Sequence, residues 1–250
     1  MDRSLEFKGS FPTGAGRSVT GGSNPQAVPH TGAGHSVTGD HVLPIPPAPG
    51  FRCSFAPIHV WCGDLPHFEQ TGVTTFVTFR LRDSLPAEKL AELRALRDEW
   101  MRAHPTSGEM SIDEAVCYRR FIGGNVEKWL DAGHGSCPFR RAELREIVED
   151  AILHFNGVRY WLYAFVVMPN HVHVLFTPMD GFKVRDIVRS WKKFSATAVR
   201  RTTGGTGAFW EDEYWDTLIR DGEHFRRALN YTVRNSPTTA WNAYSLPVTE

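Results

Sequence analysis

The stretch of sequence that decides the fold is residues 158–177, VRYWLYAFVVMPNHVHVLFT. Up to Met168 it is an almost unbroken run of β-branched and aromatic residues, which is typical of a strand covered on both faces. Pro169 and Asn170 then mark a turn, after which the chain re-enters a strand. Because alternate residues of a strand project to opposite faces, the predicted β-hairpin places His171 and His173 on one face, just after the turn.

Other strands and helices are predicted on both sides of this hairpin. Residues 73–81 alternate between the two faces of a further strand. Near-helical spacing of apolar residues, bounded by Pro86 and Pro237, predicts helices at residues 86–104, 112–131, 142–155, 182–201 and 223–235. The helix at 182–201 is amphipathic, and Phe194 is expected in its apolar stripe together with Trp191.

The first part of the chain has a different composition. Residues 1 to about 50 are rich in Gly, Ser, Thr, Pro and Ala, and the block TGAGRSVTG at 13–21 returns as TGAGHSVTG at 31–39. Such a segment cannot bury enough apolar surface to offset the entropy lost on ordering, and two copies are too few for a solenoid. We therefore predict a disordered tail at residues 1–57, followed by one folded domain at residues 58–245.

The formal charge of the chain is balanced, with 28 Lys and Arg against 28 Asp and Glu. Any attraction to nucleic acid must therefore come from local clustering. Seven basic residues share the outer face of the helix at 182–201 with one acid, Asp186. A solvated surface helix is the plain interpretation, but the imbalance favours contacts with phosphate. The candidate DNA-binding residues are Arg189, Lys192, Lys193 and Arg200.

Cysteine usage and hydropathy indicate a compartment. The four cysteines include no Cys-x-x-Cys pair, and no cleavable apolar leader precedes the domain, which favours free thiols in a reducing cytoplasm. The longest apolar run, residues 161–168, is far below the roughly 20 residues needed to cross a bilayer. We therefore expect a cytoplasmic protein without a membrane span.

Two pairs of residues are candidates for chemistry. His171 and His173 can present their imidazoles to one metal ion while Val172 anchors the opposite face in the core, although the histidines could instead be held only by hydrogen bonds. On the last helix, Tyr231 and Asn235 are four residues apart and share a face, so the phenol could attack a substrate while the amide oxygen helps to hold the ion. The plain alternatives are a packed tyrosine and a helix-capping asparagine.

These residues resemble the single-tyrosine HUH transposases, in particular those associated with repetitive extragenic palindromes (REP). The resemblance covers residues 74–241, and its most specific segment is VVMPNHVHV at 166–174. The other matching segments are TFVTFRL at 75–81, GVRY at 157–160, the Trp-containing helix at 182–201, YWD at 214–216, IRD at 219–221 and Tyr231-x-x-x-Asn235. The resemblance implies an α+β, ferredoxin-like domain with an antiparallel sheet, in which the histidine strand is central and the tyrosine helix lies across the sheet edge.

Carried over residue by residue, the resemblance implies that His171 and His173 bind a divalent ion, Mg²⁺ or Mn²⁺. Asn235 would be the third ligand and Tyr231 the nucleophile. The implied activity is cleavage and strand transfer of single-stranded or hairpin DNA through a 5′-phosphotyrosine intermediate, by a monomer or homodimer associated with the nucleoid. Relatives often read Asn-Pro after the tyrosine helix, whereas this chain has Asn235-Ser-Pro.

Other functions fit the residues less well. A nucleotide hydrolase of the histidine-triad type needs a histidine at position 175, where Leu175 stands, and a zinc hydrolase of the His-x-His-x-Asp-His type needs Asp and His at 175 and 176. The remaining alternative is a repressor derived from a transposase, which binds hairpin DNA but no longer cuts it. Retention of both histidines, Tyr231 and Asn235 argues against that alternative.

Overall fold

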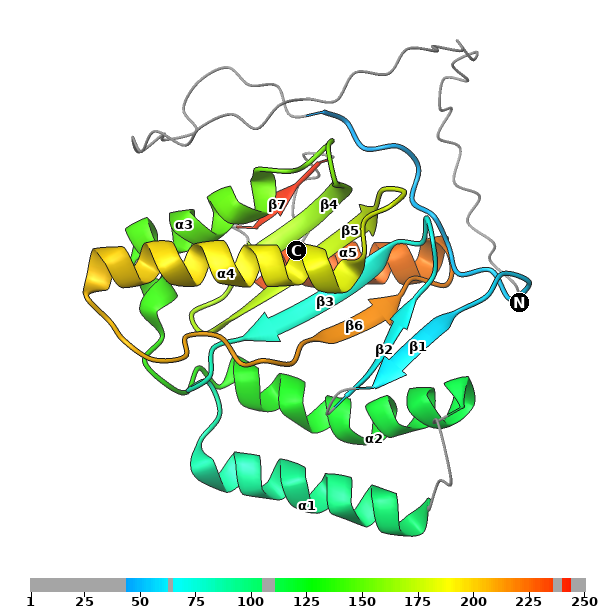
Figure 1. Ribbon diagram of the computed structural model, residues 1–250, viewed down its shortest axis with the longest axis horizontal. Helices are drawn as coiled ribbons and strands as arrows, with labels where there is room; N and C mark the ends of the chain where they lie inside the picture. Colours follow the sequence, from blue (N-terminus) through cyan, green and yellow to red (C-terminus); the bar gives the residue numbers. More distant parts are fainter. Residues whose placement is uncertain (1–43, 63–64, 105–110, 236–239, 244–250) are drawn as a thin grey trace, which may run out of the picture. The chain divides into compact units, whose positions relative to one another are not determined.

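The computed structural model describes residues 44–62, 65–104, 111–235 and 240–243 (Figure 1). The sequence repeat and most of the predicted tail lie outside the described residues, while residues 44–57 are described as an extended segment with turns. That segment is hydrogen-bonded to the folded domain, because the Arg52 amide donates to the Ile219 carbonyl and the Thr74 amide donates to the Gly50 carbonyl.

A twisted antiparallel sheet forms the centre of the described domain. Among the described residues it contains five strands in the order β6-β3-β5-β4-β7. Their bounds are Thr75–Arg80 (β3), Tyr160–Val167 (β4), His171–Pro178 (β5), Trp215–Leu218 (β6) and Trp241–Asn242 (β7). A separate antiparallel pair is made by β1 (His59–Cys62) and β2 (Pro66–Glu69). The predicted α+β class is confirmed, and so is the central position of the histidine strand.

The helices begin and end close to the predicted residues. Their bounds are Ala87–Ala103 (α1), Ile112–Asp131 (α2), Ala142–Leu153 (α3), Val184–Thr203 (α4) and Gly222–Asn235 (α5). Ser111 and Glu114 form a capping box that starts α2, and Gly204 ends α4 with a φ of 70° that favours glycine. Within the described part of the chain, none of the helices is both long and apolar enough to span a membrane.

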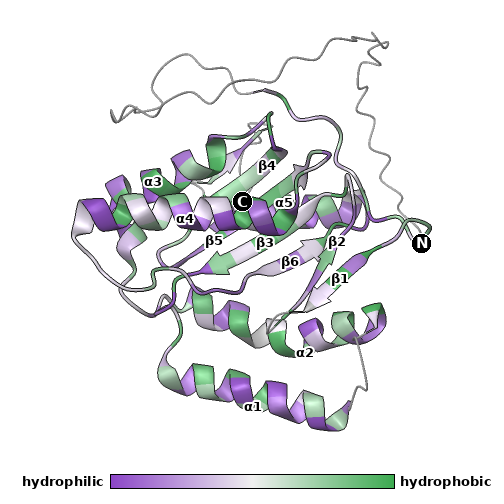
Figure 2. Cartoon of the chain, in the orientation of Figure 1, coloured by the Kyte–Doolittle hydropathy of each residue, from purple (hydrophilic) through white to green (hydrophobic). Residues whose placement is uncertain are grey.

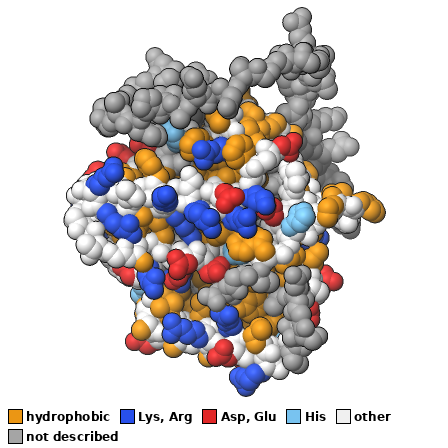
Figure 3. Space-filling model, viewed as in Figure 1, with side chains coloured by type: hydrophobic (Ala, Val, Ile, Leu, Met, Phe, Trp, Pro, Cys, Tyr) orange, Lys and Arg blue, Asp and Glu red, His pale blue; other side chains and the backbone are white. Residues whose placement is uncertain are grey.

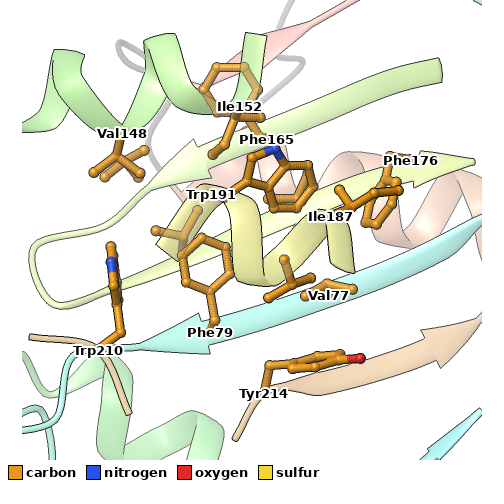
Figure 4. Packing of buried hydrophobic residues seen from close by; sticks show 14 of the residues in the cluster. Val77, Phe79, Val148, Ile152, Phe165, Phe176, Ile187, Trp191, Trp210 and Tyr214 are labelled. Atoms are coloured by element: carbon orange, nitrogen blue, oxygen red, sulfur yellow. The ribbon is translucent and has the colours of Figure 1, made fainter. Parts of the chain in front are cut away.

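The central strand β5 separates two packed faces. Val172, Val174 and Phe176 pack with α3 and α4 around the fully buried Trp191 (Figure 4). In Figure 2, β4 and β5 are largely hydrophobic, whereas α4 alternates hydrophilic and hydrophobic residues, as expected of a helix with one buried side. The opposite face of β5 carries His171, His173 and Leu175, and Leu175 packs with α5.

Two expectations about packing are wrong. The tyrosine helix α5 does not lie across the sheet edge but over β4 and β5, because Phe225 and Leu229 of α5 pack against Tyr163 and Leu175. Phe194 does not belong to the buried stripe of α4, since its side chain is 59% exposed. Ser195 is buried in its place, and its hydroxyl accepts a hydrogen bond from the Trp210 indole.

Candidate active site

The first two residues of β5 that face α5 form a close imidazole pair. The Nε2 atoms of His171 and His173 are 3.0 Å apart, and both side chains are almost fully buried. The Nδ1 atom of His171 is 2.8 Å from the Asn170 Oδ1, and that of His173 is 2.8 Å from the Thr78 hydroxyl on the neighbouring strand β3. Each ring is therefore held from its far side, and the two Nε2 atoms face each other at hydrogen-bonding distance.

The hydrogen bonds of Asn170 determine the tautomer of His171. The Asn170 Nδ2 donates to the His134 carbonyl at 2.9 Å, so the amide oxygen must be the atom that faces His171. An amide oxygen only accepts, so the Nδ1 of His171 carries the proton and its Nε2 presents a lone pair. A second shell of this kind is what orients histidines that bind metal.

The loop that carries the His134 carbonyl depends on a glycine. Gly135 has a φ of 89°, and a Cβ atom at this position would lie 2.4 Å from the Asp83 carbonyl oxygen. A larger residue would therefore have to move the loop. The preceding residue, His134, supplies the carbonyl that accepts from Asn170.

Burial makes the imidazole pair neutral. It lowers the pKa of His171 to about 4, and it lowers the pKa of His173 well below its usual 6.5, with the neighbouring His171 adding to the effect. Neutral imidazole is the form that binds metal ions. The pair therefore carries no positive charge near neutral pH, which is compatible with metal binding and unlike a cationic anion-binding site.

Tyr231 reaches the same place from α5. Its ring centroid is 5.2 Å from that of His173, in an edge-to-face arrangement, and both residues belong to the same chain. Burial raises the pKa of the Tyr231 hydroxyl, and the nearby Glu127 carboxyl raises it further. Among the described residues, the buried Tyr231 hydroxyl and the buried Asn235 Nδ2 have no hydrogen-bond partner of normal geometry, although Glu127 and Asn235 lie close enough to the phenol to act on its pKa. Unsatisfied buried polar groups are rare in folded proteins, and two at one place suggest that a ligand completes the site.

The end of α2 contributes acids that the sequence reasoning missed. An oxygen of Asp131 lies 3.9 Å from the His171 Nε2, and Glu127 and Asp131 both act electrostatically on Tyr231. Burial and the charge of Glu127 raise the pKa of Asp131. The four-residue spacing of these acids on a predicted helix was a usable signal, but nothing in the sequence indicates which helix end meets the histidines.

The described residues contain no group of three or more His, Cys, Asp or Glu side chains arranged to hold a metal ion. An ion held by His171 and His173 could take a further oxygen from the Asp131 carboxylate, 3.9 Å from the His171 Nε2, or from the Asn235 amide on α5. Bound substrate could supply the remaining positions, as in catalytic sites that keep coordination positions open.

The predicted DNA-binding residues lie on the other side of the sheet. Figure 3 views the α4 side, where Lys and Arg side chains gather in a band. Arg189 and Lys193 are exposed there. The Lys192 amino group donates to the backbone carbonyls of residues 211–213, and the Arg200 guanidinium donates to the Gly207 carbonyl. Of the four candidates, Arg189 and Lys193 present the more available charges.

Exposed arginines also occur on the tyrosine helix itself. Arg227 and Arg234 are exposed and stand four residues before and three residues after Tyr231, which places all three on one side of α5. Arg227 is paired with Glu223. Their spacing around Tyr231 was a usable sequence signal, although it is weaker than the charge imbalance of α4.

Most of the candidate site residues fall within a segment that matches a known protein family. Residues 140–231 match the model of the family described as "Transposase IS200 like", a span that contains His171, His173 and Tyr231 and ends before Asn235. No curated protein matches the chain.

Two solved structures are similar at low sequence identity. One is a REP-associated tyrosine transposase bound to a REP hairpin, with 18% identity, coverage of 68% of this chain and 69% of that chain, and a TM-score of 0.38. The other is described as a transposase from Deinococcus radiodurans R1, with 16% identity, coverage of 65% and 89%, and a TM-score of 0.27. The family match is to transposases, and the predicted resemblance to the IS200-like transposases is confirmed over residues 140–231.

Proposed function

We propose that this protein is a metal-dependent transposase that cleaves and rejoins single-stranded or hairpin DNA through a covalent bond to Tyr231. The observation that carries the proposal is the meeting of two neutral imidazoles, with Nε2 atoms 3.0 Å apart, and a tyrosine ring 5.2 Å from one of them. Metal-assisted phosphoryl transfer to a protein side chain requires a nucleophilic side chain next to a site for a divalent ion.

The donor atoms fit a divalent cation. Two nitrogens bound at about 2.1 Å in adjacent octahedral positions lie roughly 3.0 Å apart, which is the separation of the two Nε2 atoms. Asn235 is the proposed third ligand, through its amide oxygen, because it lies one helical turn from Tyr231 on the same side of α5. Asp131 is the alternative oxygen donor, 3.9 Å from the His171 Nε2. A bound Mg²⁺ or Mn²⁺ would polarise the phosphate oxygens and stabilise the charge that develops in the transition state.

The reaction is a transesterification. The Tyr231 oxygen attacks phosphorus, forming a P–O bond to the phenol while the bond from phosphorus to the 3′ oxygen breaks. The Glu127 carboxylate beside the phenol can accept its proton, and the departing 3′ oxygen takes up a proton to become a hydroxyl. Attack of a 3′-hydroxyl on the 5′-phosphotyrosine reverses the step and rejoins a strand. Because the covalent bond conserves the energy of the phosphodiester, no ATP is required.

The test uses hairpin DNA with single-stranded flanks, drawn from the DNA on either side of the gene and labelled at the 3′ end. The cleaved 5′ phosphate stays on the strand that carries this label, so an adduct migrates with the protein on a denaturing gel. We expect an adduct with Mn²⁺ or Mg²⁺ for the wild type and none for Tyr231→Phe.

Tyr163→Phe is the matched control, since Tyr163 is buried on the same side but its hydroxyl lies 3.2 Å from the Thr177 hydroxyl. This variant should still form the adduct. An adduct that survives in Tyr231→Phe would disprove the assignment of the nucleophile. Hairpin binding without an adduct under any metal would support the non-cleaving repressor instead.

A further inference from the structure

A cavity lies beside the histidine pair, on the same face of the sheet. It has a volume of about 180 Å³ and is bounded by α1, α2, β3 and β6. Thr78 lines this cavity, and its hydroxyl is also the atom 2.8 Å from the His173 Nδ1. Arg80, another lining residue, pairs across the strands with His171. The cavity therefore lies next to the histidines, because β3, which lines the cavity, is the strand paired with β5.

The walls of the cavity suit a flat, apolar ring. Leu93 and Ile122 line it from the two helices, and Tyr118 and Trp215 add aromatic surface. An apolar cavity of about 150 Å³ is large enough to take up benzene, so this one can hold one aromatic ring system of similar size. Aromatic side chains stack with any nucleobase, which makes them common in sites for single-stranded nucleic acid.

The polar groups of the cavity suit the edge of a base better than a phosphate. Arg80 is paired with Glu211 at 3.0 Å, and Glu213 is 2.9 Å from the His67 Nε2. The carboxylates of Glu211 and Glu213 would repel a phosphate, but a carboxylate accepts hydrogen bonds from exocyclic amino groups and a guanidinium donates to base carbonyls. The charges that suit a phosphate backbone, Arg94 and Arg97, are exposed on α1 and also line the cavity.

We propose that this cavity binds one nucleobase of the single strand, from a nucleotide next to the phosphate that is cleaved. The inference rests on the proposed function for the position of that phosphate at the histidine pair. Insertion of the base would hold the strand beside Thr78 and so position the neighbouring phosphate near Tyr231 and the imidazoles. The cavity would thereby select the cleavage position by the identity of one base.

The test is a binding selection with a fixed hairpin that carries eight randomised nucleotides on each side. Protein with Tyr231→Phe is used in the presence of Mg²⁺, so that binding is measured without cleavage, and the bound fraction is sequenced. We expect one flank position with a preference on the order of 10- to 100-fold for a particular base. Leu93→Trp, which fills the cavity, should abolish that preference and leave others unchanged.

Ala95→Trp is the matched control, because it adds the same indole at an exposed position of the same helix. It should keep the preference. Leu90→Phe, a milder change at another lining position, replaces Leu93→Trp if circular dichroism shows that the latter is unfolded. The same preference in the filled and unfilled proteins, or no base preference in the unfilled protein, would overturn the inference. Failure of the proposed function is seen separately, as the lack of an adduct with the wild-type tyrosine.

Discussion

The two faces of strand β5 use alternate residues of one short sequence for opposite purposes. On the α4 face, Val172, Val174 and Phe176 belong to a core of large buried side chains. On the α5 face, His171 and His173 bring two imidazoles together in a setting where burial removes their charge. Adjacent residues of β5 therefore have different roles: one set packs in the core, and the other carries the candidate catalytic groups.

The faces differ most clearly in how their polar atoms are satisfied. On the α4 face, the Trp191 indole donates to the Tyr160 hydroxyl at 2.9 Å, and this hydroxyl donates to the Ile152 carbonyl at 2.6 Å. On the α5 face, the buried Tyr231 hydroxyl and Asn235 amide nitrogen have no hydrogen-bond partner of normal geometry among the described residues. The Trp191 and Tyr160 groups of the first face bond to one another and to the backbone, whereas two polar atoms of the second face are available to a ligand.

The largest expected effect comes from the α5 face. His173→Gln removes an imidazole that the proposal assigns to the metal, and the rate of adduct formation should fall about 10³-fold or more. The free energy of unfolding should change by only about 1 kcal/mol, because glutamine has a similar volume and can hydrogen-bond to Thr78. Adduct kinetics and urea denaturation measure the two quantities. An unchanged adduct rate in a folded variant would contradict the role of His173.

The reciprocal change lies on the α4 face. Trp191→Ala should lower the free energy of unfolding by about 3 to 5 kcal/mol, because Trp191 is only 1% exposed and packs on Phe79, Tyr160 and Phe176. Phe194→Ala, three residues along and exposed, should change it by less than about 0.5 kcal/mol. Adduct formation per folded molecule should survive both changes. Similar destabilisation by the two variants would show that the α4 core is not arranged as described.

The sequence alone predicted those differences between the two faces that depend on the periodicity of strands and helices. Alternation along residues 171–177 separates the histidines from the core valines, and helical spacing predicts the bounds of α2. Four residues are one helical turn, so Tyr231 and Asn235 were expected on the same side of α5. These features are local, and local geometry determines them.

What the sequence did not reveal depends on how elements meet. Periodicity shows that α4 has a buried side, but not which face of the sheet receives it, and so not that its basic side lies away from the histidines. The approach of Asp131 to His171 depends on how α2 docks against the sheet. Ser195 is buried where Phe194 was expected, and it meets Trp210, whose indole donates to the Ser195 hydroxyl. Such contacts join residues that are far apart in sequence.

A smaller effect should separate the basic residues of the two sides. Arg227→Gln with Arg234→Gln removes charge beside Tyr231, and Arg189→Gln with Lys193→Gln removes charge from the α4 side. Each lost phosphate contact lowers the slope of log affinity against log salt by roughly 0.7 to 0.9, so both pairs should weaken hairpin binding. Only the α5 pair should also slow adduct formation at saturating DNA, by about tenfold. Equal adduct rates for the two pairs would mean that the α5 arginines do not position the substrate.

The smallest effect concerns His67, a buried histidine whose pKa is raised, whereas the pKa values of His171 and His173 are lowered. His67 of β2 lies between two carboxylates, with Nδ1 3.2 Å from Asp216 and Nε2 2.9 Å from Glu213. Burial acts to lower its pKa, but hydrogen bonds to Asp216 and Glu213 outweigh that effect, so the pKa of His67 is raised above 6.5. Since both acceptors are carboxylates, both ring nitrogens can donate only when the imidazolium is present.

The sign of the pH dependence follows from that raised pKa. The unfolded chain has the usual histidine pKa, so the stabilisation is complete below about 6.5 and is lost as the pH rises through the higher pKa of the folded protein. From pH 6.5 upward the free energy of unfolding should fall, by no more than about 1.4 kcal/mol per pH unit. His67→Gln should remove this component, while His59→Gln, exposed on the adjoining strand β1, should retain it. Urea denaturation over a series of pH values measures the slope. A slope that persists in His67→Gln would assign the pH dependence to another group.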